Sequence, residues 1–302
     1  MNMIEVHELK KRYKDVLVVK GVSFHVQNGE VFGFLGKNGA GKTTTVNMLT
    51  GICLPTEGKF FINGISHRNM DEIKKYIGVM PDVSNYYLHM NAIEHLKFFA
   101  QLKRTKVKKE NIYDLLEQVG LNGHEKKKVG HYSFGMKKKL GIAQALIGDP
   151  KVIFLDEPTS GLDPESAFAI QEMIKRLSNE GLTIFMTSHN LYEVEKICDK
   201  VAIMENGLIS KIGTIEQLKK SGVSHVEIVI KIKGDYNYAA QRLQQTMSDE
   251  IAHIYHDHHY IYCSLYHEDS IPTCVRMLCN SGINVYELNV KERSMEDVFF
   301  GK

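Results

Sequence analysis

The chain has 302 residues, of which 43% are hydrophobic and 25% charged, and its formal net charge is only +2. This length suits two globular domains, and the balanced charge argues against a nucleic-acid-binding protein. No apolar run is long enough to span a bilayer, and the first residues form no apolar signal-peptide core, so we expect a cytoplasmic protein. Five cysteines without a Cys-x-x-Cys pair predict neither a disulfide framework nor a zinc ribbon.

The first 221 residues alternate strand-like and helix-like segments, which predicts an α/β domain with a largely parallel sheet. Val31–Leu35 is a short apolar strand candidate that leads into a glycine-rich segment and then a helical pattern. Lys151–Leu155 and Thr183–Thr187 are further apolar, β-branched-rich runs, each followed by a helical pattern. Asn206-Gly207 between two strand-like runs indicates a two-residue hairpin.

The glycine-rich segment after the first of these strands matches G-x-x-x-x-G-K-[ST], the P-loop pattern. Glycines let consecutive backbone N–H groups point at a phosphate, and the following helix adds the positive end of its dipole. The strand before it and the helix after it disfavour a simple glycine-rich turn. Lys42 places a cation near the β- and γ-phosphates, and the Thr43 hydroxyl can ligate Mg²⁺. The residues expected to bind the ATP phosphates are Gly36, Asn38, Gly39, Ala40, Gly41, Lys42, Thr43 and Thr44.

An acidic pair follows the apolar run at Val152–Leu155. Asp156 stands at the carboxyl end of this predicted buried strand, where it can hold Mg²⁺, usually through water. Glu157 would then lie beside the γ-phosphate and could orient or deprotonate the attacking water. Alone, such a pair is more often a strand end that meets solvent, but beside a P-loop it predicts a catalytic site.

Together these residues resemble the ABC ATPase cassette, from about residue 2 to residue 220. Tyr132-Ser133-Phe134-Gly135-Met136 occupies the place of the family's signature loop, usually Leu-Ser-Gly-Gly-Gln, ahead of a helix expected over Lys137–Gly148. The resemblance implies that Ser133 and Gly135 reach across a dimer and contact the γ-phosphate of the partner's ATP. Phe134 and Met136 depart from the family pattern, which implies differently shaped contacts there.

The resemblance assigns roles to four more positions of the sequence. Asp163, in Pro158–Asp163, matches the aspartate that couples the two sites of a dimer. His189 matches the histidine that contacts the γ-phosphate and the catalytic glutamate. Tyr13 stands where an aromatic residue stacks on adenine. Asp82 replaces a glutamine that in most members senses Mg²⁺ and the membrane partner.

The segment Met80-Pro81-Asp82 and the closing Ser294–Phe299 resemble a branch that includes drug, antimicrobial-peptide and sodium exporters. The resemblance implies ATP and Mg²⁺ as cofactors and a homodimer or a dimer with a paralogous cassette. It also implies an integral membrane permease that holds the chain at the inner face of the cell membrane, and no nucleic-acid partner. The expected fold is a P-loop cassette with a mostly parallel core sheet, an antiparallel subdomain and a helical subdomain. The alternative function is a soluble non-transport ABC ATPase or a regulatory ATP sensor.

Ser221-Gly222 marks the expected boundary between the ATPase domain, residues 1–221, and an accessory domain, residues 222–302. The accessory domain has the order strand-helix-strand-strand-helix-strand, which predicts a small α+β ferredoxin-like fold. The segments in that order are His225–Lys233, Tyr238–Met247, Ile251–Tyr255, Tyr260–Leu265, Ser270–Asn280 and Ile283–Val290.

Periodicity predicts which side chains of the accessory domain are buried. One face of the first strand should carry Val226, Ile228, Ile230 and Ile232. One side of the second helix should carry Val275, Leu278 and Cys279. Three histidines near the hairpin tip, His256, His258 and His259, could suggest a metal site, but solvated polar residues are usual in a turn.

Overall fold

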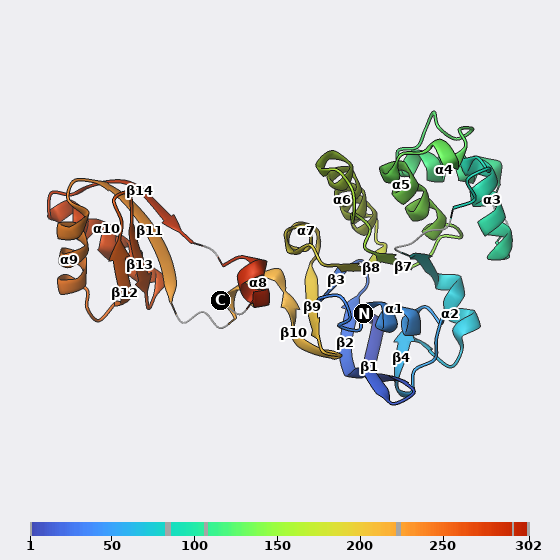
Figure 1. The fold of residues 1–302 in the computed structure, drawn as a ribbon, viewed down its shortest axis with the longest axis horizontal. Coiled ribbons are helices and arrows are strands. Elements are labelled where there is room, and N and C mark those ends of the chain that lie inside the picture. Colours follow the sequence, from blue (N-terminus) through green and yellow to red (C-terminus); the bar gives the residue numbers. More distant parts are fainter. Residues whose placement is uncertain (1, 82–85, 106–107, 222–224, 292, 301–302) are drawn as a thin grey trace. The chain divides into compact units, whose positions relative to one another are not determined.

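A computed structural model describes residues 2–81, 86–105, 108–221, 225–291 and 293–300 (Figure 1). The chain divides into two compact units, Met1–Ile215 and Glu216–Lys302. The division lies a few residues before the boundary expected from the sequence. Among the described residues, no helix combines the length and the apolar character needed to cross a membrane.

The first unit is built around a six-stranded sheet with the order β10-β9-β3-β8-β7-β6. All neighbouring strands are parallel except β9 and β10, which form the antiparallel hairpin expected at Asn206-Gly207. The strands are β3 (Val31–Leu35), β6 (Ile77–Met80), β7 (Val152–Asp156), β8 (Thr183–Ser188), β9 (Lys200–Glu205) and β10 (Leu208–Thr214). Because β3, β7 and β8 are buried along almost their whole length, they are continuous apolar runs rather than alternating ones.

A second, antiparallel sheet with the order β2-β1-β4-β5 packs against this core. Its strands are β1 (Asn2–Tyr13), β2 (Val16–Gln27), β4 (Glu57–Ile62) and β5 (Ile65–Ser66). Phe24 of β2 joins the two sheets, because its ring centroid lies 5.4 Å from that of Phe32 and 6.0 Å from that of Phe185. This sheet is the expected antiparallel subdomain.

Helices complete the first unit, and those between β6 and β7 form the expected helical subdomain (Figure 1). That subdomain contains α3 (Ala92–Leu102), α4 (Lys109–Gln118), η1 (Val129–His131) and α5 (Phe134–Ala145). The others in this unit are α1 (Lys42–Leu49), α2 (Met70–Tyr76), α6 (Pro164–Asn179) and α7 (Leu191–Ile197), and α8 (Ile215–Lys220) follows at the division between the units. Helix α5 begins at Phe134 and not at Lys137 as expected, because Ser133 caps its first turn.

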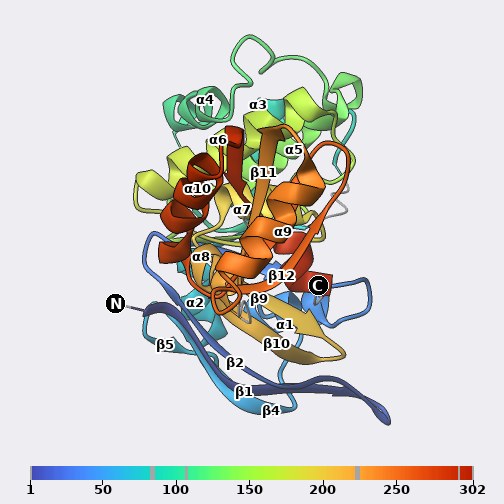
Figure 2. The ribbon, with the colours of Figure 1, turned by 90° about the vertical axis from the view of Figure 1, so that its left-hand side faces the viewer.

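The second unit has the strand-helix-strand-strand-helix-strand order that the sequence predicts. Its antiparallel sheet has the order β12-β13-β11-β14, and Figures 1 and 2 show α9 and α10 side by side against one face of it. The elements are β11 (Val226–Lys233), α9 (Tyr236–Thr246), β12 (Ile251–His256), β13 (Ile261–Leu265), η2 (Glu268–Ser270), α10 (Ile271–Asn280), β14 (Asn284–Val290) and α11 (Met295–Phe300).

The core of the second unit contains the expected face of β11, with Ile228, Ile230 and Ile232 buried. The expected face of the second helix is wrong in part. Cys274 and Leu278 are the fully buried residues of α10, whereas Cys279 is exposed. Because both sides of this helix carry apolar residues, periodicity alone cannot predict which side is buried. The packing of the helix against the sheet determines it.

Candidate nucleotide-binding and catalytic site

The P-loop lies between β3 and α1, as expected. Gly41, at φ 111°, is the N-cap of α1 in a backbone conformation that favours glycine. A Cβ atom at Gly36 would come within 2.4 Å of the Met204 carbonyl oxygen, so only glycine lets the loop pack against β9. Of the other predicted phosphate ligands, Ala40 is buried, Thr44 is half-buried, and Asn38, Gly39 and Thr43 are exposed.

Lys42 is 7% exposed, and its Nζ donates a 2.6 Å hydrogen bond to the backbone carbonyl of Gly36. Burial lowers the pKa of Lys42, and the nearby carboxylates of Glu157 and Asp156 oppose this shift. The ammonium group is thus held against the backbone of the loop, next to the first turn of α1, whose N–H groups have no partner within the helix itself. This is the arrangement that a phosphate anion requires.

Asp156 and Glu157 are held at the end of β7 by the neighbouring strand β8. Asp156 is paired in register with Thr187, whose hydroxyl donates a hydrogen bond to Asp156 Oδ1. The same hydroxyl accepts a 3.1 Å hydrogen bond from the backbone N–H of Glu157. Thr187 therefore fixes both acidic residues, and the sequence analysis did not single it out. Aligning the two predicted parallel strands at their carboxyl ends would have placed Thr187 opposite Asp156 and so indicated its role.

The side chain of Glu157 contacts His189, with 2.8 Å between Oε2 and Nδ1. This distance is short enough for a hydrogen bond between the carboxylate group and the imidazole ring. The Glu157 side chain is 14% exposed and that of His189 is 60% exposed. The structure therefore brings together the two residues predicted to be catalytic, although 32 positions separate them in the sequence.

Glu157 has a left-handed backbone conformation, with φ at 51°, which is uncommon for a residue that is not glycine. Lys138 of α5 supports it by donating a 2.7 Å hydrogen bond from Nζ to the Glu157 carbonyl oxygen. Lys138 is only 4% exposed, and its Nζ lies 5.6 Å from the ring centroid of Phe134. The sequence analysis did not single out Lys138, because its burial shows only once α5 is packed against the rest of the domain.

The predicted signature residues lie at the start of α5, in the helical subdomain, while the P-loop precedes α1. The Ser133 hydroxyl accepts a 3.2 Å hydrogen bond from the backbone N–H of Met136. Gly135 packs closely against α6, because a Cβ atom there would lie 3.0 Å from Ser166 Oγ. Phe134, which replaces a glycine of the usual pattern, is 54% exposed.

Asp163 is the N-cap of α6 and accepts a 2.9 Å hydrogen bond from the backbone N–H of Ser166. Hydrogen bonds from Ser166 lower the pKa of Asp163, so this exposed cap stays ionised. Asp163 therefore stabilises the start of α6 within a single chain, independently of any contact that it would make in a dimer. Asp82 lies outside the residues that the structure describes.

Tyr13 ends β1 and is 46% exposed. Its hydroxyl lies 3.7 Å from Cys53 Sγ, and Lys11 Nζ lies 5.0 Å from the centroid of its ring. The hydrogen bond with Cys53 is the main reason that the pKa of Tyr13 is raised. The ring is therefore anchored at its hydroxyl end while much of it is open to a ligand, as a stacking role requires.

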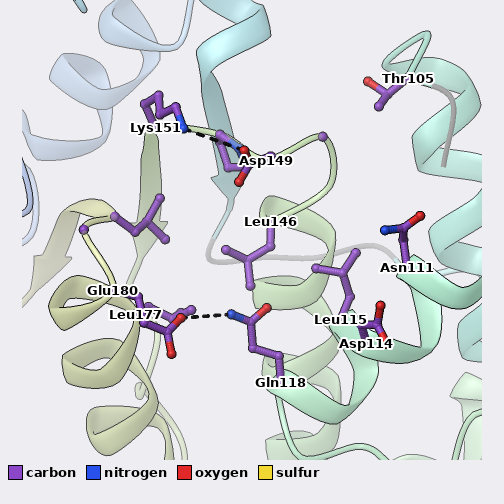
Figure 3. A pocket seen from close by; sticks show the side chains of 14 residues that line it. Thr105, Asn111, Asp114, Leu115, Gln118, Leu146, Asp149, Lys151, Leu177 and Glu180 are labelled. Carbon is purple, nitrogen blue, oxygen red and sulfur yellow. Dashed lines mark hydrogen bonds and ion pairs between the residues drawn. The ribbon is translucent and has the colours of Figure 1, made fainter. Parts of the chain in front are cut away.

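A cavity of about 520 Å³ lies elsewhere in the first unit, and its lining contains none of the predicted site residues. Figure 3 shows Gln118 of α4 facing Glu180, which follows α6, with a 3.4 Å hydrogen bond between them. Asp149 and Lys151 form an exposed ion pair near the opposite wall. The described residues that line the cavity include none from the glycine-rich loop or from the first turn of α1, which together form the predicted phosphate site. We interpret it as a groove between packed helices.

The predicted histidine cluster gives no metal site in the described residues, where no group of three or more His, Cys, Asp or Glu side chains is placed to hold an ion. The Asp257 carboxylate instead closes the hairpin turn. Its Oδ1 accepts hydrogen bonds from the backbone N–H groups of His259 and Tyr260, at 2.7 and 2.8 Å. The turn explains the polar cluster.

Known proteins resemble this chain in sequence and in fold. The profile of the family described as "ABC transporter" matches residues 19–160. The bacitracin transport ATP-binding protein BcrA of Bacillus licheniformis is 35% identical over 300 residues, 98% of this chain and 96% of that protein. The linearmycin resistance ATP-binding protein LnrL of Bacillus subtilis is 32% identical over 315 residues, 98% and 97% of the two chains. A solved ATP-binding subunit of an ABC transporter is 28% identical with a TM-score of 0.65, covering 72% of this chain and 92% of that one.

Proposed function

Since the chain belongs to the ABC transporter family as an ATP-binding subunit, we propose that it hydrolyses ATP with Mg²⁺ and thereby drives export through a separate integral membrane permease. The observation that carries this proposal is the contact between Glu157 and His189 beside the P-loop. Glu157 would orient or deprotonate the attacking water, and His189 would hold the carboxylate and contact the γ-phosphate. Lys42 would bind the β- and γ-phosphates.

Thr43 and Asp156 are the residues that would hold Mg²⁺. The ion prefers hard oxygen ligands, and both side chains supply them. Thr43 is exposed at the start of α1. Within the described residues the structure gives a hydrogen bond to Asp156 Oδ1 and none to Oδ2, so one carboxylate oxygen is left for the ion or its water. When bound, Mg²⁺ neutralises charge on the phosphates.

The active unit would be a dimer, either of this chain with itself or with a paralogous cassette. Ser133 and Gly135 lie in a different subdomain from the P-loop, which supports a role toward a partner's nucleotide. Asp163, at the exposed start of α6, would couple the two sites. Tyr13 would stack on the adenine.

The permease would place the chain at the inner face of the membrane, where Asp82 and the residues after it would receive a cytoplasmic helix of that partner. Tyr87 and Leu88 are 39% and 54% exposed, which supports an apolar contact there. Export of antimicrobial compounds is favoured by the two relatives named for bacitracin transport and linearmycin resistance, which match nearly the whole chain.

The test first examines the reading frames beside the gene for a hydrophobic protein with several predicted membrane helices, and then expresses this chain together with that protein in a host sensitive to antimicrobials. We expect membrane association and a raised inhibitory concentration for at least one antimicrobial, both dependent on the second protein. The Glu157→Gln variant is the matched control, which should reach the membrane without conferring resistance. ATP hydrolysis without membrane association under any condition would favour a soluble ATPase or a regulatory sensor instead.

A further inference from the structure

A buried carboxylate lies directly behind the predicted catalytic pair. Glu193 of α7 is 1% exposed, and each of its two oxygens accepts a hydrogen bond from a different segment. Thr159 Oγ1 donates to Oε1 over 2.5 Å, and Ser188 Oγ donates to Oε2 over 2.9 Å. The backbone N–H of Glu193 donates to Asn190 Oδ1 over 3.2 Å, which caps the helix.

The two donors of Glu193 are neighbours of the two predicted catalytic residues. Thr159 stands two positions after Glu157, on the loop that leaves β7. Ser188 ends β8 and directly precedes His189. The carboxylate therefore joins the two segments whose side chains meet at the 2.8 Å contact between Glu157 and His189. Glu193 therefore makes a second connection between the ends of β7 and β8, in addition to the one that Thr187 makes.

Stability alone is a poor explanation for a carboxylate in this place. Burial is the main cause that raises the pKa of Glu193, and the two hydroxyl donors oppose the shift. Removing a carboxylate from water is costly, and two neutral donors recover that cost only in part. What the carboxylate supplies that an apolar residue could not is two directed hydrogen bonds, one to each segment.

We propose that Glu193 is a positioning residue for ATP hydrolysis, which sets the distance between Glu157 and His189 by binding Thr159 and Ser188 at the same time. Glu193 does not itself contact the nucleotide. This inference rests on the proposed roles of Glu157 and His189. It assigns the loop after β7 a specific task, since a shift of that loop would move the carboxylate of Glu157 away from the water that it must orient.

The experiment uses the full chain and a matched pair of variants at Thr159. Thr159→Val keeps the shape of the side chain and removes the hydroxyl, whereas Thr159→Ser keeps the hydroxyl. We expect Thr159→Val to lower kcat about tenfold with the ATP dissociation constant unchanged within about twofold, and Thr159→Ser to retain most of the activity. Glu193→Gln should act in the same direction as Thr159→Val. If Glu193→Gln does not fold, the comparison of Thr159→Val with Thr159→Ser still tests the proposal.

A double-mutant cycle separates positioning from general structural damage. In a His189→Ala background, where the contact with Glu157 is already lost, Thr159→Val should lower the residual kcat much less than about tenfold. Equal losses in the two backgrounds, equal activity of the Val and Ser variants, or a loss that lies wholly in ATP affinity would overturn the inference. If instead Glu157→Gln hydrolyses ATP at a near-normal rate, the proposed function of the site fails, which is a different result from these.

Discussion

Lys138 Nζ donates a 2.7 Å hydrogen bond to the backbone carbonyl of Glu157, so helix α5 and the end of β7 are joined at the proposed catalytic residue. The Glu157 N–H is held from the other side by Thr187. Both ends of one residue in a left-handed conformation are therefore fixed, which is how proteins maintain a strained backbone at a functional site. Helix α5 also begins with the signature residues, so the same helix serves the proposed site of a partner and the site of its own chain.

We predict that Lys138→Met lowers kcat about tenfold or more while ATP affinity stays near that of the unchanged chain. Methionine fills a similar length with apolar atoms, so the packing should change little and the free energy of unfolding should fall by only about 1–3 kcal/mol for the lost hydrogen bond. The Glu157 carbonyl, however, loses its donor. The control is Lys139→Met, the next residue on the helix, which should hydrolyse ATP normally. Steady-state phosphate release and nucleotide titration check both, and equal activity of the two variants would contradict the role of Lys138.

Glu157 and Lys42 should separate catalysis from binding. We predict that Glu157→Gln binds ATP normally, lowers hydrolysis at least about 100-fold and traps an ATP-bound dimer, because the amide cannot accept a proton from water. Lys42→Ala should instead weaken ATP binding, since it removes the cation held against the backbone of the P-loop. Nucleotide affinity and phosphate release measured on both variants test this, and near-normal hydrolysis by the Glu157 variant would exclude its assigned role.

A mixing experiment tests whether each site is built from two chains. Alone, Ser133→Ala dimers lack the signature hydroxyl in both sites, and Glu157→Gln dimers lack the catalytic carboxylate in both. A mixed dimer contains one site with the Glu157 of one chain and the Ser133 of the other, so mixing the two variants before adding ATP should raise activity above the sum of the separate rates.

The control for this prediction is a chain that carries both substitutions, mixed with either single variant, which offers no complete site and should give no gain. Hydrolysis by the unchanged chain should also rise more than linearly with protein concentration. An additive rate on mixing, or a rate strictly proportional to concentration from a chain shown to stay monomeric, would refute the shared site.

Local patterns predicted the parts of this site that lie within one segment. The P-loop spacing pointed to Lys42 and the apolar strand pointed to Asp156 and Glu157, and the structure places the two acidic residues near that lysine. Thr187, Lys138 and Glu193 escaped because their roles depend on partners from other elements. A buried glutamate in a short helix differs in no local pattern from an exposed one. The face of α10 was misassigned for the same reason, since only the packing against the sheet selects Cys274 over Cys279.

His95 should make the helical subdomain sensitive to acid. The side chain is fully buried on α3, with its Nε2 3.0 Å from Gln144 Oε1 and no partner for Nδ1 among the described residues. Burial lowers the pKa of His95 below the usual 6.5. The unfolded chain therefore binds a proton at a higher pH than the folded chain, and stability present above pH 6.5 is lost as the pH falls toward the folded value.

We predict that His95→Phe removes part of the loss in unfolding free energy between about pH 7.5 and about pH 5.5. Urea unfolding at several pH values measures this, and the control is His131→Gln, an exposed histidine whose replacement should leave the pH dependence unchanged. If both variants show the same pH dependence as the unchanged chain, another group is responsible.

The second unit should be separable from nucleotide binding. Its core cluster consists of its own residues, among them Ile230, Leu243 and Leu278, and the cluster described around β3 in the first unit contains no residue after Ile209. We predict that the truncated chain binds ATP with an affinity close to that of the full chain. The described residues of this unit include no cluster of side chains typical of a catalytic site, so we assign the unit a dimerising or regulatory role. We therefore also predict that the truncated chain forms a weaker ATP-dependent dimer or is stimulated less by the permease.

The control for the truncation is Leu243→Ala in the full chain, which leaves a cavity in the core of the second unit and should cost it about 2–5 kcal/mol of stability without touching the first. If that unit supports the dimer, the substitution should weaken dimerisation in the same direction as the truncation but less. Sedimentation with ATP and hydrolysis with reconstituted permease provide the two measurements. A truncated chain that dimerises and responds to the permease as the full chain does would show that the second unit has no regulatory role.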